Sequence, residues 1–347
     1  MEMRPAWLRS VVPWLLLAGG LGFFLYLLDR FGVSALVHSI ATARWSLLGI
    51  VSLWVPIYLL NTAAWWLLLG PYGRGLSYGR LLALTVSGFA LNYATPFAHL
   101  GGEPYKAYVL RRDLGAPGAI AAVVVYRMVH MLGHMSMLIS GAVFTLFWVP
   151  LPPSVRRGLS LSVVGLLAVA LLIISRHRKG LFTQLFGWMT RNGFMRRLTD
   201  RWPLSPDVLR EMDGVVTHAY RHRAGRFLGA VLLEYFSRLL MVLEVYLALR
   251  GIGVSVSLLD AVVIHTVWSI VINVLSVVPF SVGVQEGGFY VILPAFHVDP
   301  LVSVYVGTVV RLRELVWILI GLGTVVGLSR RRPVVGPARY PEGGACP

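Results

Sequence analysis

The sequence of 347 residues is poor in cysteine and in charge. Its one cysteine, Cys346, excludes a disulfide framework and a cysteine-ligated metal site. Charged residues make up 13% of the chain and hydrophobic residues 57%, whereas a soluble domain carries about 25% charged residues. No set of residues has the spacing of metal ligands, so we expect no metal and no cofactor. These shortages indicate a membrane protein.

Acidic residues are scarcer than basic ones, and the 15 Asp and Glu against 31 Lys and Arg give a net charge of +16. Such an excess can indicate a nucleic-acid partner. Here most of the basic residues gather in particular loops between apolar runs, which is the pattern that sets membrane topology. We therefore expect no nucleic acid, and anionic membrane lipids as the counter-charge.

Apolar runs predict an all-α polytopic membrane protein, because about 20 apolar residues are needed to cross a bilayer as a helix. We predict six full spans and two segments, 81–98 and 264–282, that Pro and Gly break into re-entrant or discontinuous helices. The predicted domain covers 1–328. The six full spans are 9–28, 45–69, 118–147, 158–175, 227–249 and 301–328.

The loop charges predict the orientation. With the N-terminus in the cytoplasm, the inner segments hold 22 Lys and Arg and the outer loops five, so we expect a multi-pass protein of the cytoplasmic (inner) membrane with both termini inside. The basic insert 176–226 contains an amphipathic stretch that either lies on the membrane surface or packs against the spans. The tail 329–347 is expected to be disordered.

The two broken segments resemble each other. A shift of 183 residues places Glu103 on Glu286 and brings a Pro-Phe pair, a Leu and a Pro into register. The predicted topology inverts one copy relative to the other, giving repeat segments 81–147 and 264–328. Inverted repeats with broken helices are typical of secondary transporters, whose binding site lies at the repeat interface.

Glu103 and Glu286 are the leading candidates for substrate contact, because they lie at equivalent points of the two breaks. Each either lines a central cavity or caps its helix and fixes the break. Gly101, Gly102 and Gly287 beside them allow a headgroup to approach the backbone closely.

A cationic stripe follows the first break. Arg127, His130 and His134 share one helical face and either hold a lipid phosphate or are satisfied internally, for Arg127 by Glu103. Lys106 either attracts a phosphate at the inner mouth of the cavity or anchors the span. Asn92 is expected to satisfy backbone groups that the break frees.

A matching charged group follows the second break. Arg311 and Arg313 either bind a phosphate or form an internal salt bridge, with Arg311 and Glu314 able to pair on one face. Glu234 and Arg238 have the spacing and order of a structural helix pair.

Several short motifs resemble the flippase-like membrane domain of lysylphosphatidylglycerol synthases and of its stand-alone relatives. The resemblance covers about 10–328, and Gln285 departs from it where relatives often carry a basic residue. It implies that a lipid headgroup passes between the two repeats. Residues 329–347 alone follow the last predicted span, so lysyl transfer is not carried over. The motifs are GGE with KAYVLRR (101–112), Tyr126-Arg127, PFSVGVQEG (279–287) and RLRE (311–314).

We therefore predict an integral membrane lipid transporter with no catalytic residues, whose substrate is a phospholipid, a hopanoid or a polyprenyl-linked lipid. Two alternatives stay open at this point, a membrane-embedded lipid-modifying enzyme such as a glycosyl or acyl transferase, and a non-catalytic subunit of a lipid-synthesis complex. A homodimer is also compatible with the sequence.

Overall fold

The described part of the chain is helical and contains no β-strand, which confirms the all-α prediction. The first predicted span, the basic insert and the tail lie almost wholly outside it. The computed structural model describes residues 32–73, 75–94, 101–150, 153–177, 224–275 and 281–330, together with Val278 and a few positions between 22 and 30.

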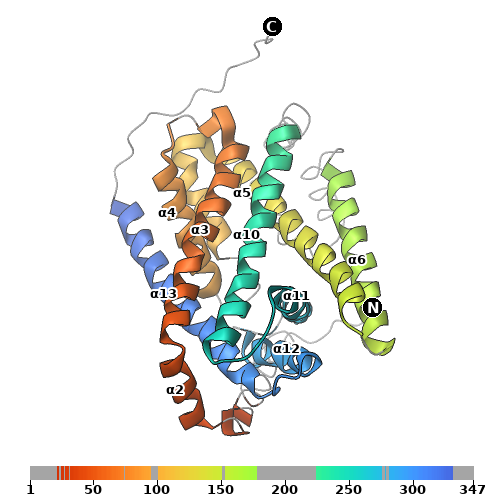
Figure 1. Cartoon of the computed structure of the whole chain (residues 1–347). Helices are drawn as coiled ribbons and strands as arrows, with labels where there is room; N and C mark the ends of the chain where they lie inside the picture. Colours follow the sequence, from red (N-terminus) through yellow and green to blue (C-terminus); the bar gives the residue numbers. More distant parts are fainter. Residues whose placement is uncertain are drawn as a thin grey trace, which may run out of the picture.

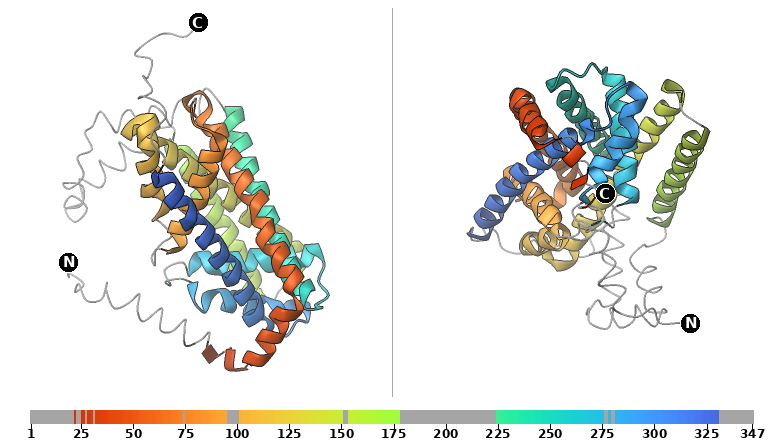
Figure 2. Two further views of the ribbon diagram at one scale, coloured as in Figure 1. Left: turned by 90° about the vertical axis from the view of Figure 1, so that its left-hand side faces the viewer. Right: turned by 90° about the horizontal axis from the view of Figure 1, so that it is seen from below.

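Long helices form an elongated bundle whose members run roughly side by side (Figures 1 and 2). Their bounds agree with four of the predicted spans to within a few residues. These helices are α3 (Arg44–Leu69), α5 (Gly102–Trp148), α6 (Pro153–His177), α10 (Ala224–Gly251) and α13 (Val302–Arg330).

Two of these helices are long and apolar enough to cross a membrane. By length and hydropathy α3 and α5 qualify as membrane-spanning helices, and α11 (Leu258–Val274) is apolar but shorter. The number of helices that cross the bilayer stays a prediction. The segment 29–44, which we expected to be an outer loop, contains a helix, α2 (Val33–Thr42). This helix is rich in apolar residues and directly precedes α3.

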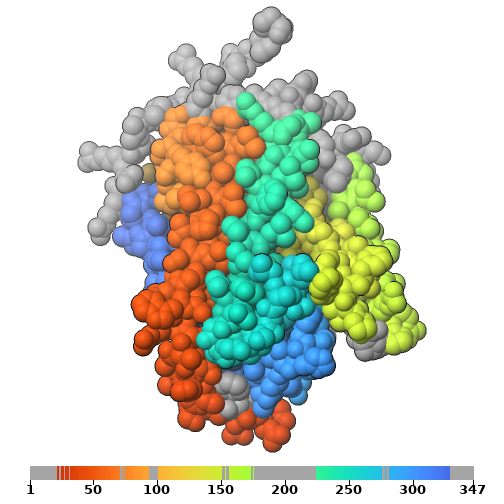
Figure 3. Space-filling view, in the orientation of Figure 1, coloured from red at the N-terminus to blue at the C-terminus, as the bar shows by residue number. Residues whose placement is uncertain are grey.

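Helices α3 and α10 pack side by side and, with α11, form one continuous face in the space-filling view (Figure 3). Glycines allow close contact. A Cβ on Gly229 of α10 would lie 3.0 Å from Leu67 of α3, and a Cβ on Gly251 would collide with Ser46. The packed interior is therefore specified by small residues at helix crossings as well as by large apolar ones.

The first broken segment consists of α4 (Tyr78–Ala94) and the start of α5. The predicted span 118–147 is joined to the stretch that follows the break, because α5 continues from Gly102 across a kink at Gly115. Gly115 has φ 72° and ψ 165°, a backbone conformation that favours glycine. The kink turns the chain between a short helix after the break and the long helix beyond it.

The second broken segment has the same order of parts. Helix α11 ends at Val274, α12 (Val284–Ile292) begins after Gly283 in a left-handed conformation (φ 75°), and the short 3₁₀ helix η3 (Leu293–Phe296) leads to α13. Helix α12 packs against α11, since a Cβ on Gly288 would lie 3.0 Å from Trp268. The inverted relation of the two segments stays a prediction.

Candidate functional site

The start of α5 is held against α4 by backbone contacts. The Gly102 N–H donates to Oδ1 of Asn92 at 2.7 Å, and a Cβ on Gly102 would collide with the Gly88 carbonyl oxygen. Gly101, the N-cap residue, provides no side-chain cap. Asn92 therefore satisfies a backbone group that the break frees, as the sequence predicted.

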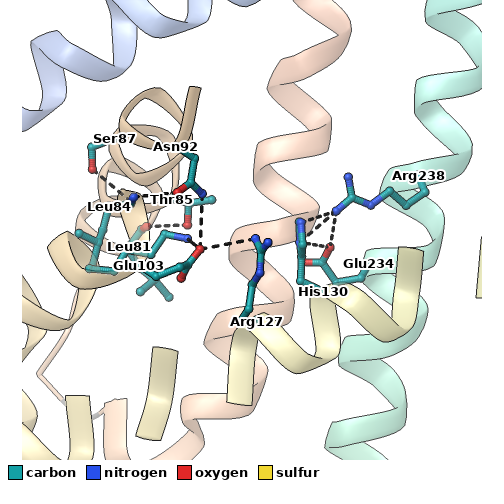
Figure 4. Close-up of polar contacts among 12 residues, drawn as sticks. Leu81, Leu84, Thr85, Ser87, Asn92, Glu103, Arg127, His130, Glu234 and Arg238 are labelled. Atoms are coloured by element: carbon teal, nitrogen blue, oxygen red, sulfur yellow. Dashed lines mark hydrogen bonds and ion pairs between the residues drawn. The ribbon is translucent and has the colours of Figure 1, made fainter. Parts of the chain in front are cut away.

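Glu103, Lys106 and Arg127 form what we call the first charged cluster. Glu103 Oε1 lies 3.3 Å from Lys106 Nζ and 3.6 Å from an Arg127 guanidinium nitrogen, and Asn92 Nδ2 lies 3.5 Å from the same oxygen. Two cations share one carboxylate, so the cluster carries one excess positive charge. Figure 4 shows Arg127 reaching from α5 toward Glu103.

Lys106 is buried among aromatic side chains, which favours its predicted role as an anchor over contact with a phosphate. Its exposed fraction is 5%, and Nζ lies 5.6 Å from the Trp65 ring and 5.3 Å from the Tyr126 ring, which allows cation–π contacts. Gly88 leaves the space for its stem, because a Cβ there would collide with Lys106 Cε. Long-range packing, which local sequence does not reveal, buries this lysine.

Arg127 is the accessible cation of the first charged cluster. Its side chain is 35% exposed, against 6% for Lys106 and 15% for Glu103. A guanidinium presents five donors, and one carboxylate oxygen at 3.6 Å leaves most of them for another acceptor. Arg127 is therefore the member of this cluster best placed to meet an anionic ligand.

His130, Glu234 and Arg238 form what we call the buried triad, named after its carboxylate. It lies one turn along α5 from Arg127, and the His130 side chain is 25% exposed. His130 Nδ1 lies 2.9 Å from Glu234 Oε2, and an Arg238 nitrogen lies 3.7 Å from the same oxygen. Glu234 is fully buried. The predicted Glu234–Arg238 pair is present with His130 added to it (Figure 4). His134 contacts Asn273 Nδ2 at 2.9 Å instead of joining this group.

Glu286 and Arg311 form what we call the second charged cluster. Arg311 Nε donates to Glu286 Oε1 and its NH2 group to Oε2, both at 3.0 Å, and NH2 also donates to the Ser281 carbonyl at 3.2 Å. This fork is the strongest geometry for an Arg–carboxylate pair. The hydrogen-bonded partner of Arg311 is Glu286 from α12, and the predicted pairing of Arg311 with Glu314 stays a prediction. Gly287, beside Glu286, donates its N–H to the Gly283 carbonyl at 2.9 Å.

Arg313 forms an internal ion pair that the sequence did not specify. Its Nε donates to Glu244 Oε1 at 2.9 Å, and its guanidinium carbon lies 4.0 Å from the Trp54 ring centroid. Glu314 lies 3.8 Å away. The side chain is 2% exposed, so this arrangement favours the salt-bridge interpretation over phosphate contact. The signal for Glu244 was an acidic residue within an apolar span.

Metal ligation finds no support in the described residues, where no group of three His, Cys, Asp or Glu side chains comes together. The charged side chains pair instead as acids with Lys, Arg and His.

Comparison with known protein families matches residues 12–323 to the family described as "Lysylphosphatidylglycerol synthase TM region". No curated protein and no solved structure matched the chain.

Proposed function

The chain belongs to the lysylphosphatidylglycerol synthase TM region family, and from that premise we propose that it transports a lipid, with the headgroup passing beside the two broken helices. The family relation supports a membrane protein connected with lipid synthesis or flipping. The charged clusters supply the polar surface that a headgroup needs to leave water and cross an apolar layer.

The observation that carries this proposal is the charge and exposure of the first charged cluster. It holds one excess positive charge inside an apolar bundle, and Arg127, its most exposed member, keeps most of its donors available. Within a membrane, a cation that lacks a full counter-charge is unfavourable by several kcal/mol. A phosphate on a lipid headgroup would supply the missing acceptor and charge.

The second charged cluster suits a different role in transport. The Glu286–Arg311 fork is neutral, and Gly307 leaves no space beside it, since a Cβ there would lie 2.8 Å from Glu286 Oε1. We propose that this fork closes the path on its side of the membrane. Movement of the headgroup past it would require the fork to open.

We further propose that the protein lies in the cytoplasmic membrane with the upper end of the bundle in Figure 1 facing the cytoplasm. That end carries the end of α3 and the starts of α4 and α10 (Figure 1). The loops assigned to it hold most of the Lys and Arg residues, and such loops stay on the cytoplasmic side.

The test is lipid movement in proteoliposomes that carry labelled phosphatidylglycerol. We expect the purified protein to accelerate exchange of the label between leaflets. Glu103→Gln or Arg127→Gln should reduce the exchange rate at least about 10-fold, which corresponds to a loss of about 1.4 kcal/mol of transition-state stabilisation. Mass spectrometry of copurified lipid would identify the natural headgroup.

Arg80→Gln is the matched control. Arg80 pairs with Asp113 at 2.7 Å and also joins α4 to α5, but its side chain is 25% exposed and lies outside the charged clusters. We expect normal transport in this variant. Formation of a modified lipid from an activated donor, with no leaflet exchange, would favour an enzyme and contradict the proposal.

A further inference from the structure

The buried triad fixes a carboxylate at a helix crossing. Glu234 is 0% exposed, and α5 passes so close to it that a Cβ on Gly133 would collide with Glu234 and lie 3.1 Å from Tyr235 N. A buried carboxylate is strongly unfavourable without charged partners. Glu234 therefore depends on His130 and Arg238.

One nitrogen of Arg238 contacts both ring nitrogens of His130, lying 3.1 Å from Nδ1 and closer to Nε2. The guanidinium therefore lies directly against the His130 ring. A proton on His130 would place two positive charges in contact, and like charges at this distance repel each other. Protonation of His130 therefore opposes its contact with Arg238, which gives the triad two distinct states.

The groups around His130 set the charge balance of these states. On α5 they are Tyr126, which interacts with Glu234, and the neighbouring Arg127 and His134. Glu234 and Arg238 face it from α10, and His265 lies near the group on α11. With a neutral imidazole the triad sums to zero. With a proton on His130 it carries one positive charge and Arg238 is released.

An anionic headgroup would favour the protonated state. Arg127 and His130 lie three residues apart on α5 and share a face, so a phosphate at Arg127 would meet the new positive charge. The released Arg238 would add donors to the same site. Proton binding and phosphate binding then strengthen each other by the same factor, as linkage requires.

We propose that His130 and Glu234 form a proton site that couples the lipid transport proposed above to a proton gradient, with the proton and the headgroup moving in the same direction. The proton adds to Nε2 of His130, because Nδ1 faces Glu234. Arg238 then turns to the phosphate, and the proton returns to water when the headgroup leaves. This inference rests on the proposed function and assigns its energy source.

The experiment uses proteoliposomes with labelled phosphatidylglycerol and a trapped pH-sensitive dye. We expect a proton gradient along the direction of lipid movement to raise the rate about 5-fold or more, and an imposed lipid gradient to drive proton entry. Glu234→Gln and His130→Gln should abolish lipid-driven proton entry. Arg80→Gln, which breaks an ion pair outside the charged clusters and the triad, should retain it.

A second measurement avoids variants that fail to fold. Titration calorimetry of the wild-type protein with short-chain phosphatidylglycerol, in buffers of different ionisation enthalpy, should reveal proton uptake on binding. A lipid transport rate that does not depend on the proton gradient, together with no proton uptake on binding, would overturn the proton site. The proposal of lipid transport would not be affected. A wild-type protein that moves no lipid would overturn both.

Discussion

Replacing Glu244 with Gln tests whether the Arg313 ion pair holds the bundle together. Glu244 is the 2.9 Å partner of Arg313, and their side chains are 5% and 2% exposed. Removing one member of a buried pair leaves an uncompensated charge and destabilises a protein by about 3–5 kcal/mol. Glu314, 3.8 Å from Arg313, compensates for part of this. We therefore expect a loss of about 3 kcal/mol in the free energy of unfolding.

Steric trapping in lipid bicelles measures this free energy without leaving a membrane-like solvent. The double variant Glu244→Gln, Arg313→Met removes both charges and should recover most of the loss. Asp113→Asn breaks the more exposed Arg80 pair and should change stability by less than about 1 kcal/mol. A single-variant loss under about 1 kcal/mol, or a double variant less stable than the single one, would refute the reasoning.

Two further predictions concern the breaks. Gly102→Ala should lower the free energy of unfolding by about 1–3 kcal/mol, because its Cβ meets the rigid Gly88 carbonyl, and steric trapping would detect this. Arg311→Lys should either slow lipid exchange in proteoliposomes or make it uncontrolled, because an ammonium group cannot form both 3.0 Å bonds to Glu286. Exchange kinetics like those of the wild-type protein would contradict a gating role.

Much of the fold could be predicted from the sequence because the length of an apolar run corresponds to the length of a helix. The prediction 45–69 differs by one residue from Arg44–Leu69, and 301–328 is close to Val302–Arg330. Helix α2 and the continuity of α5 were missed. Both depend on how short segments pack at the ends of spans, where hydropathy says little. Gly115 and Pro117 were the available signal for the kink.

The sequence could predict which charged residues belong to the candidate site, but only some of the pairs that they form. Local spacing correctly suggested Glu234 with Arg238, since neighbours on a helix must lie close. The same rule paired Arg311 with Glu314 and could not indicate Glu286, the hydrogen-bonded partner of Arg311, because Glu286 comes from another helix. Ion pairs between helices depend on packing that spacing along one helix cannot express.

The charge balance of the clusters gives a physical reason why the headgroup would cross together with a proton. The ion-paired acids and the Lys and Arg cations among the described clusters are equal in number, so the interior is neutral while His130 is neutral. Moving an anionic headgroup alone across the membrane against the potential would cost about 2.3 kcal/mol per 100 mV. A headgroup that enters with a proton on His130 adds no net charge, and its crossing is independent of the potential. The acids are Glu103, Glu234, Glu244, Glu286 and Glu314, and the cations are Lys106, Arg127, Arg238, Arg311 and Arg313.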